Sequence, residues 1–273
     1  MKLGKIHIVT LICLFFMTMA PNIFSKTVLP DIKEEMITYK SGDVTMAGFV
    51  AYDNNVKGQR PVVLVVHEWW GLNNYTKMRA RKLAELGYFA MAVDLFGDGK
   101  NATNPKEAQE LTGPFYQNPQ LAKDRLDAAI VKAKEFPQAD PNNIAAIGYC
   151  FGGGMVLNSA KLGADFKAVV SFHGGLAGVP AVKGLLKAKI LVCQGGSDKF
   201  VSKADGDEFK HKLDSIGATY TFKVYPNAMH AFTNPDATRL GKTFNLPIEY
   251  NEKADKDSWD DMKVFLASVF KGK

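Results

Sequence analysis

The sequence predicts an α/β fold in which a mostly parallel sheet carries helices on both faces and an antiparallel hairpin at its N-terminal end. Three observations predict it. Apolar runs of strand length alternate with segments of helical periodicity, which favours strand–helix–strand units with right-handed crossovers. Several runs are apolar without interruption, as in strands buried on both faces. No internal repeat or low-complexity linker follows residue 26, so residues 26–273 are expected to form a single domain.

The hairpin and the strands are predicted from short runs of apolar and β-favouring residues. Residues 34–53 contain two such stretches, joined by the turn sequence Ser41-Gly42-Asp43. The later strands are each expected from one apolar run, and they span residues 61–67, 88–94, 143–150, 166–175, 188–196 and 220–226.

Helices are expected between these strands, where apolar residues recur at helical spacing. Met78, Leu83 and Leu86 mark the first helical face, and Gly87 ends it. A small-residue helix is expected directly after Cys150. The other predicted helices begin at residue 105 or span residues 120–136, 202–216 and roughly 255–270, and the first spans residues 73–86.

Residues 1–25 have a different character. Lys2 and Lys5 precede an apolar run from Ile6 to Ala20, which is shorter than the ~20 residues of a transmembrane helix. A charged start before a short apolar run is typical of a secretory signal peptide. We therefore expect residues 1–25 to be cleaved and the mature protein to be periplasmic or secreted, without stable membrane insertion. An uncleaved membrane anchor is the alternative.

Charge and cysteine content narrow the classes of function. The net charge of +6 is spread over 273 residues without a block of five like charges, whereas nucleic-acid binding requires a clustered basic stripe. Cys193 lies in an apolar run and Cys150 at a turn, so we expect both to stay unpaired. No residues have metal-ligand spacing, and no metal or cofactor is expected.

Four side chains that carry chemistry follow four predicted strands. Glu68, Cys150, Asp198 and His230 each come just after one. Because ligands of parallel sheets bind at the carboxyl ends of the strands, we expect these side chains to lie close together. Each also has a plainer explanation, since a cysteine can fill a core and an aspartate after two glycines can form a turn. The predicted active site rests on their joint placement.

The stretch Gly148-Tyr149-Cys150-Phe151-Gly152 matches the G-x-S-x-G turn of many hydrolases, with cysteine as the nucleophile. Such a turn places the thiol at the start of a helix, where the helix dipole favours a thiolate. Cys150, Asp198 and His230 follow one another in the chain order nucleophile, acid, base. The imidazole would take the thiol proton, and the acid would fix the imidazole tautomer.

Backbone N–H groups and aromatic side chains complete the predicted site. The N–H groups of Phe151 and Trp69 are the expected donors to the oxyanion of a tetrahedral intermediate. The side chains expected to contact substrate are those of Trp70, Phe96, Tyr116 and His173.

The motifs HEWWGLN, LAELGYFAMAVDLFG, IGYCFGGGMVLN, GGSDKFV and YPNAMHAFTNPDA occur in this order across most of residues 34–273. Through them the chain resembles the dienelactone hydrolase family of the α/β-hydrolases. The resemblance implies the α/β-hydrolase fold and hydrolysis of an ester or lactone through an acyl-thioester, with Cys150 as nucleophile, His230 as base and Asp198 as its orienter. It also places Glu68 near the thiol. We hypothesise that Glu68 opposes thiolate formation and holds Cys150 as a thiol until substrate arrives.

The chain departs from this family at two arginines that bind the carboxylate of a dienelactone. Residues 97–118, where one is expected, contain only Lys100 and Lys106 as cations, and Asn234 stands where the second would fall. Neither residue type provides the two-point grip of a guanidinium group. The sequence therefore predicts a small-molecule ester or lactone as the partner, without predicting cleavage of dienelactone itself.

Two other functions are compatible with the same residues. The thiol can serve an acyltransferase or a thioesterase, because water and other nucleophiles compete for one acyl-enzyme. The chain can also be a non-catalytic binding protein on a hydrolase scaffold. The intact set of Cys150, Asp198 and His230 argues against a binding protein, which does not need all three.

Overall fold

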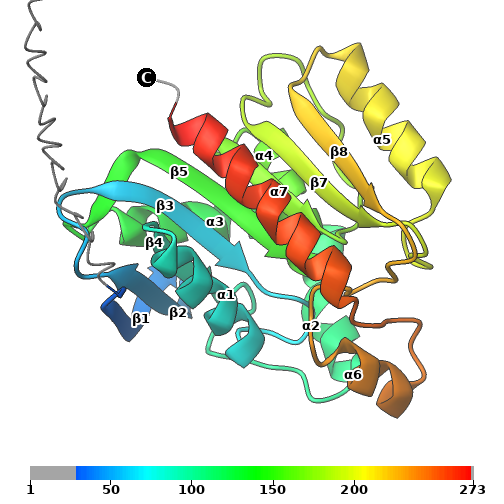
Figure 1. Ribbon diagram of the computed structural model, residues 1–273, viewed down its shortest axis with the longest axis horizontal. Coiled ribbons are helices and arrows are strands. Elements are labelled where there is room, and N and C mark those ends of the chain that lie inside the picture. Colours follow the sequence, from blue (N-terminus) through cyan, green and yellow to red (C-terminus); the bar gives the residue numbers. More distant parts are fainter. Residues whose placement is uncertain (1–28, 272–273) are drawn as a thin grey trace, which may run out of the picture.

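The computed structural model describes residues 29–271, and the predicted signal peptide lies outside them. The described residues form one eight-stranded sheet between layers of helices (Figure 1). The strands are β1 (Ile32–Ser41), β2 (Val44–Asp53), β3 (Arg60–Val66), β4 (Phe89–Val93), β5 (Ala139–Tyr149), β6 (Ala168–Phe172), β7 (Lys189–Gly195) and β8 (Tyr220–Tyr225). The helices are α1 (Asn74–Glu85), α2 (Pro105–Gln117), α3 (Gln120–Ala133), α4 (Phe151–Lys161), α5 (Lys203–Ser215), α6 (Ala237–Phe244) and α7 (Glu252–Phe270).

The strand order confirms the predicted fold class. The sheet runs β1-β2-β4-β3-β5-β6-β7-β8. β1 and β2 form the predicted hairpin, closed by Ser41 opposite Val44 around Gly42, whose φ of 58° suits glycine. β2 pairs antiparallel with β4, and every later pair in the order is parallel. The chain thus has the α/β-hydrolase-like architecture that the sequence indicated.

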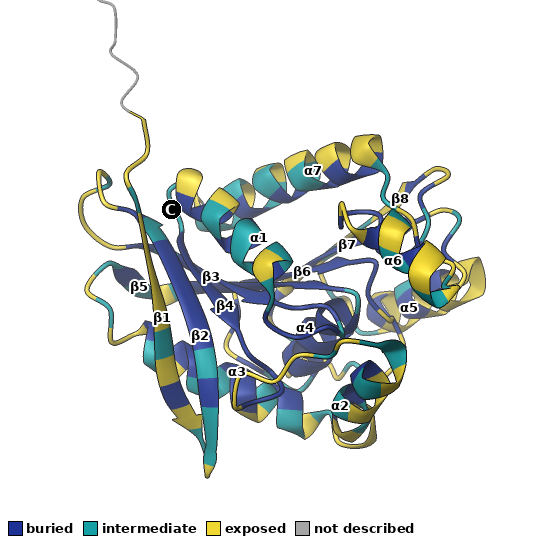
Figure 2. Cartoon of the chain, turned by 90° about the horizontal axis from the view of Figure 1, so that it is seen from below, coloured by how far each residue is buried: buried dark blue, intermediate teal, exposed yellow. Residues whose placement is uncertain are grey.

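The uninterrupted apolar runs are explained by cores on both faces of the sheet. In β3, Val62, Leu64 and Val66 point into one core, and Val63 and Val65 point into the other. All five are fully buried, and Figure 2 shows the central strands in the colour of buried residues. α1 and α7 cover one face, and α3 and α4 cover the opposite face (Figure 1).

The carboxyl ends of the parallel strands meet at one edge of the sheet, where α2 and α6 also lie (Figure 1). The sequence did not predict α6, because its eight residues include few apolar ones and its first turn has no capping side chain. Within residues 29–271, none of the helices has the length and apolar character needed to cross a membrane.

Candidate active site

Cys150 lies in a tight turn between β5 and α4. Its φ of 52° and ψ of −115° place a non-glycine residue in a strained conformation that costs about 1–3 kcal/mol. Two glycines allow the turn to close. A Cβ atom on Gly148 would lie 2.2 Å from the carbonyl oxygen of Gly152, and one on Gly152 would lie 2.5 Å from that of Val66. The glycines of the motif are therefore required by the close approach of α4 to β5 and β3.

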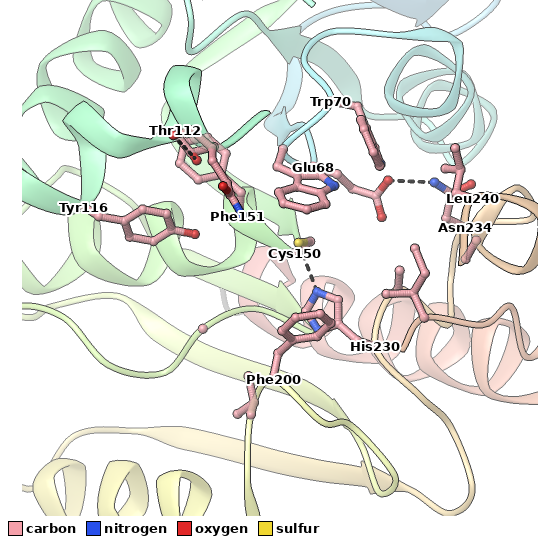
Figure 3. A pocket seen from close by; sticks show the side chains of 17 residues that line it. Glu68, Trp70, Thr112, Tyr116, Cys150, Phe151, Phe200, His230, Asn234 and Leu240 are labelled. Carbon is pink, nitrogen blue, oxygen red and sulfur yellow. Dashed lines mark hydrogen bonds between the residues drawn. The ribbon is translucent and has the colours of Figure 1, made fainter. Parts of the chain in front are cut away.

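Three of the predicted residues form one chain of hydrogen bonds. The Nε2 atom of His230 lies 3.0 Å from the Sγ atom of Cys150, and a dashed line marks this hydrogen bond in Figure 3. The Nδ1 atom of His230 lies 2.9 Å from Oδ2 of Asp198. Burial lowers the pKa of His230, but the charge of Cys150 and the hydrogen bond with Asp198 outweigh this effect and raise the pKa to about 10. The raised pKa means that the imidazole of His230, placed between the thiol and the carboxylate, binds a proton readily.

Asp198 is held by its own loop as well as by His230. Its Oδ1 atom accepts hydrogen bonds from the N–H groups of Phe200 and Val201, at 2.8 and 3.2 Å. Its Oδ2 atom accepts a third bond from the amide of Gln194, at 2.8 Å. The side chain is completely buried. Together with His230, four hydrogen-bond donors therefore surround this carboxylate, and these bonds offset the cost of burying it.

His173 lies behind the Cys150 turn. Its Nδ1 atom accepts the backbone N–H of Cys150 at 3.1 Å, and its Nε2 atom lies 2.7 Å from the hydroxyl of Thr233, which in turn contacts the hydroxyl of Tyr75 at 2.6 Å. Burial, followed by the positive charges of His230 and Arg79, holds the pKa of His173 well below its usual value. The ring is therefore neutral, with Nε2–H donating to Thr233.

This buried network connects two parts of the site. Thr233 follows His230 by three residues, so His173 joins the turn that holds the nucleophile to the loop that holds the imidazole. Sequence reasoning missed Thr233 altogether. A threonine that follows a histidine carries no signal of its own until the fold brings a second buried histidine against it.

Glu68 is nearly buried and only partly hydrogen-bonded. Its exposed fraction is 2%, and its Oε2 atom accepts the Asn234 amide at 2.6 Å. Its Oε1 atom has no hydrogen-bond partner among the described residues. Burial raises the pKa of Glu68 to about 7, although the bond from Asn234 opposes the shift. The side chain faces the same cavity as Cys150 (Figure 3), and no hydrogen bond joins the two side chains in the structure.

A cavity of about 300 Å³, here called the Cys150 cavity, lies in front of the thiol. α2 and α6 supply parts of its wall, through residues such as Tyr116 and Leu240. The predicted site residues that line it are Glu68, Trp69, Trp70, Tyr116, Cys150, Phe151 and His230. Asp198 lies behind the imidazole, as its predicted role requires.

Two residues that were expected to contact substrate do not line this cavity. Phe96 is 5% exposed, because its ring packs between those of His67 and Phe151, at centroid distances of 4.6 and 5.6 Å. His173 is completely buried behind the turn and is used there for hydrogen bonding. A strand-exit position specifies the edge of the sheet but not the direction in which a side chain points.

Two backbone N–H groups next to the cavity have no acceptor among the described residues. Among the described residues, neither the N–H of Phe151 nor that of Trp69 donates a hydrogen bond, whereas the next N–H, of Gly152, donates to the carbonyl of His67 at 3.1 Å. Cys150 and Cys193 are not joined to each other. Within the part of the chain that the structure describes, no three His, Cys, Asp or Glu side chains gather in a way that would hold a metal ion.

The chain matches the model of the dienelactone hydrolase family over residues 46–270. It is 34% identical over 187 residues to a Methylorubrum extorquens protein whose name includes carboxymethylenebutenolidase, and this match covers 64% of each chain, just under two thirds. Among solved structures, a dienelactone hydrolase-like promiscuous phosphotriesterase named P91, from metagenomic libraries, is similar with a TM-score of 0.81 and 29% identity. A second, named m3DLH, has a TM-score of 0.82 and 32% identity. Each comparison covers 87% of this chain and 98% of the other.

Proposed function

Because this chain belongs to the dienelactone hydrolase family and is a hydrolase of ester or lactone bonds, we propose that Cys150 is its nucleophile, His230 its general base and Asp198 the acid that orients His230. The observation that carries the proposal is the hydrogen-bonded chain, with 3.0 Å from Sγ to Nε2 and 2.9 Å from Nδ1 to Oδ2. Nucleophile, base and orienting acid within hydrogen-bond reach are the arrangement that covalent acyl transfer needs.

In the first half of the proposed reaction, the thiol of Cys150 gives its proton to His230. The Sγ atom then attacks the carbonyl carbon of the substrate. The oxyanion that forms accepts hydrogen bonds from the N–H groups of Phe151 and Trp69. When the tetrahedral intermediate collapses, the carbon–oxygen bond breaks and the alcohol leaves with the proton from His230. An acyl-thioester on Cys150 remains.

In the second half, His230 takes a proton from water, and the resulting hydroxide attacks the thioester carbonyl. Collapse of this intermediate breaks the carbon–sulfur bond, releases the acid and returns the proton to the thiolate–imidazole pair. Asp198 stabilises the imidazolium in both halves and keeps Nε2 directed at the thiol.

The wall of the cavity favours an uncharged substrate. Among the residues that the structure describes, no lysine or arginine lines the Cys150 cavity, and the acid that does so, Glu68, is buried. An anionic substrate would find no lysine or arginine in this wall to bind it, and its charge would be repelled by Glu68 wherever that side chain is ionised. Asn234, at the position where the related enzymes' second arginine was expected, donates its amide to Glu68 instead.

Acyl transfer and thioester cleavage remain the alternatives within this mechanism, because they differ only in the leaving group or in the acceptor of the acyl group. The predicted export concerns residues 1–25, which lie outside the described residues, and it stays a prediction.

The proposal is tested by hydrolysis of a panel of neutral aryl esters and lactones. We expect the protein from Lys26 onwards to cleave members of the panel, and Cys150→Ala to lose at least ~10³-fold in kcat. Cys193→Ala is the control, because this second thiol is completely buried in β7 and distant from the turn in sequence. Equal rates for the wild type and Cys150→Ala would remove Cys150 from the chemistry.

A further inference from the structure

A second cavity adjoins the Cys150 cavity. Its volume is about 360 Å³, and it lies between the end of α2, the first half of α4 and the loop that follows β6. We call it the Leu176 cavity, because Leu176 lines this cavity and does not line the Cys150 cavity. The residues that line both cavities are Tyr116, Gly175, Phe200 and Val201. The two spaces therefore share one wall beside the nucleophile.

The shared wall exposes two large aromatic side chains. Tyr116 comes from α2 and is 62% exposed, and Phe200 comes from the loop after β7 and is 54% exposed. In Figure 3 Tyr116 lies on the opposite side of Cys150 from Asn234 and Leu240, and Phe200 lies beside His230. Exposed apolar side chains that gather at a cavity are typical of ligand-binding surfaces. This end of the site is therefore suited to an apolar group.

Within the described chain, no lysine or arginine lines the Leu176 cavity. Asp205 is its one charged residue within the described chain, and the Oδ2 atom of Asp205 is used by the N–H and the hydroxyl of Ser202, both at 2.7 Å. The Oδ1 atom of Asn158 accepts the N–H of Val179 at 3.3 Å. Met155 and Leu176 add apolar surface. An anionic ligand would therefore find no cation here, whereas an alkyl or aryl group would contact apolar side chains.

Gly175 leaves the shared wall open. A Cβ atom placed on Gly175 would meet nothing within 4 Å, and its φ lies outside the left-handed region. A larger side chain at this position would thus enter free space at the junction of the two cavities without straining the backbone.

We propose that the Leu176 cavity is a second substrate subsite, which binds an uncharged alkyl or aryl group on one side of the scissile bond while the other half of the substrate occupies the Cys150 cavity. This proposal rests on the proposed ester hydrolysis. It defines the substrate as an ester with two apolar halves, long enough to extend past Tyr116 and Phe200.

Two homologous series of esters test the subsite. One varies the acyl chain of p-nitrophenyl esters from acetate to decanoate, and the other varies the alcohol of acetate esters over the same lengths. In the wild type we expect kcat/KM to rise roughly two- to fourfold for each methylene that enters the subsite, in one of the two series. The series that responds identifies which half of the ester lies in the Leu176 cavity.

The variant Gly175→Val narrows the junction. We expect its kcat/KM on the long members of that series to fall at least ~10-fold more than its kcat/KM on the shortest member, since several buried methylenes are displaced. Gly113→Val is the matched control, because a Cβ there also meets nothing within 4 Å and Gly113 lines neither cavity. Ala177→Phe, at an exposed position that lines the Leu176 cavity and not the Cys150 cavity, gives an independent variant in case Gly175→Val does not fold.

The outcomes separate the subsite from the proposed function. Identical length profiles in the wild type and both variants would overturn the subsite, and so would an equal loss on short and long esters, which would indicate damage to Cys150 or His230. Continued cleavage of p-nitrophenyl acetate in those cases would leave the hydrolase proposal intact. Failure of the wild type to cleave any ester would overturn both.

Discussion

The two buried acids of the site are held in opposite ways. Asp198, in the loop after β7, receives hydrogen bonds from Gln194, Phe200, Val201 and His230. Glu68, in the loop after β3, receives one hydrogen bond, and its Oε1 atom has no partner among the described residues. Both carboxylates lie at the carboxyl edge of the same sheet, so burial alone does not separate them.

The difference in hydrogen bonding assigns the two acids different tasks. A carboxylate with four donors is stabilised as an anion and can fix an imidazole in one tautomer. A carboxylate with one donor is left with the cost of burial, and the pKa of Glu68 is accordingly raised to about 7. Asp198 belongs to a fixed frame, whereas Glu68 can change its charge near neutral pH within the cavity.

The largest effect on catalysis is expected when Asp198 is replaced by a residue without a negative charge. Asp198→Asn keeps the size of the side chain but presents an amide to His230, which favours the wrong tautomer of the ring. We expect kcat to fall by roughly 10³- to 10⁴-fold, as for the equivalent change in other triads. Steady-state hydrolysis of p-nitrophenyl acetate measures this. Asp214→Asn, at an exposed aspartate of α5, is the control, and an equally small effect of both variants would contradict the role of Asp198.

A smaller effect, with a pH dependence, is expected at Glu68. Because its pKa is raised from the usual 4.5 to about 7, the folded protein binds this proton more tightly than the unfolded chain does. The stability contributed by this group is therefore fully present below pH 4.5 and is lost as the pH rises through 7. Glu68→Gln removes the loss, so we expect a gain of up to about 3 kcal/mol at pH 8 and less than about 1 kcal/mol at pH 5.

Urea unfolding at the two pH values measures this gain.

The same variant tests whether Glu68 restrains the nucleophile: the pH profile of Cys150 alkylation by iodoacetamide should move to lower pH once the carboxylate is removed. An unchanged profile would end the idea that Glu68 holds Cys150 as a thiol. A gain in stability that does not vary with pH would show that Glu68 does not titrate in this range.

Much of the fold was predictable because it depends on short-range patterns. The uninterrupted run in β3 reflects two cores, and the turn at Cys150 needs glycines at positions 148 and 152 because their Cβ atoms would collide with backbone. The strand-exit rule also placed Asp198 and His230 at the correct edge. Each of these features leaves a pattern within a few consecutive residues, even where the contact that requires it, such as that of Gly152 with Val66, is distant in sequence.

The features that were missed depend on contacts between distant segments. His173 was expected at the cavity and instead supports the turn from behind, through Thr233, which lies 60 residues away in the sequence. Phe96 was expected to contact substrate and packs against His67. α6 supplies cavity wall through a segment too short and polar for its periodicity to be recognised. In each case the direction of a side chain is set by a partner from another element.

The central claim is that the Cys150–His230–Asp198 chain passes an acyl group through the thiol of Cys150. Rapid mixing of the mature protein with excess p-nitrophenyl butyrate at pH 5, followed by acid quench and intact mass measurement, tests it most directly. We predict one added butyryl group, located on Cys150 by peptide mapping, that is absent from Cys150→Ala. Turnover of the ester without any adduct on Cys150, or an adduct that persists in Cys150→Ala, would contradict the claim.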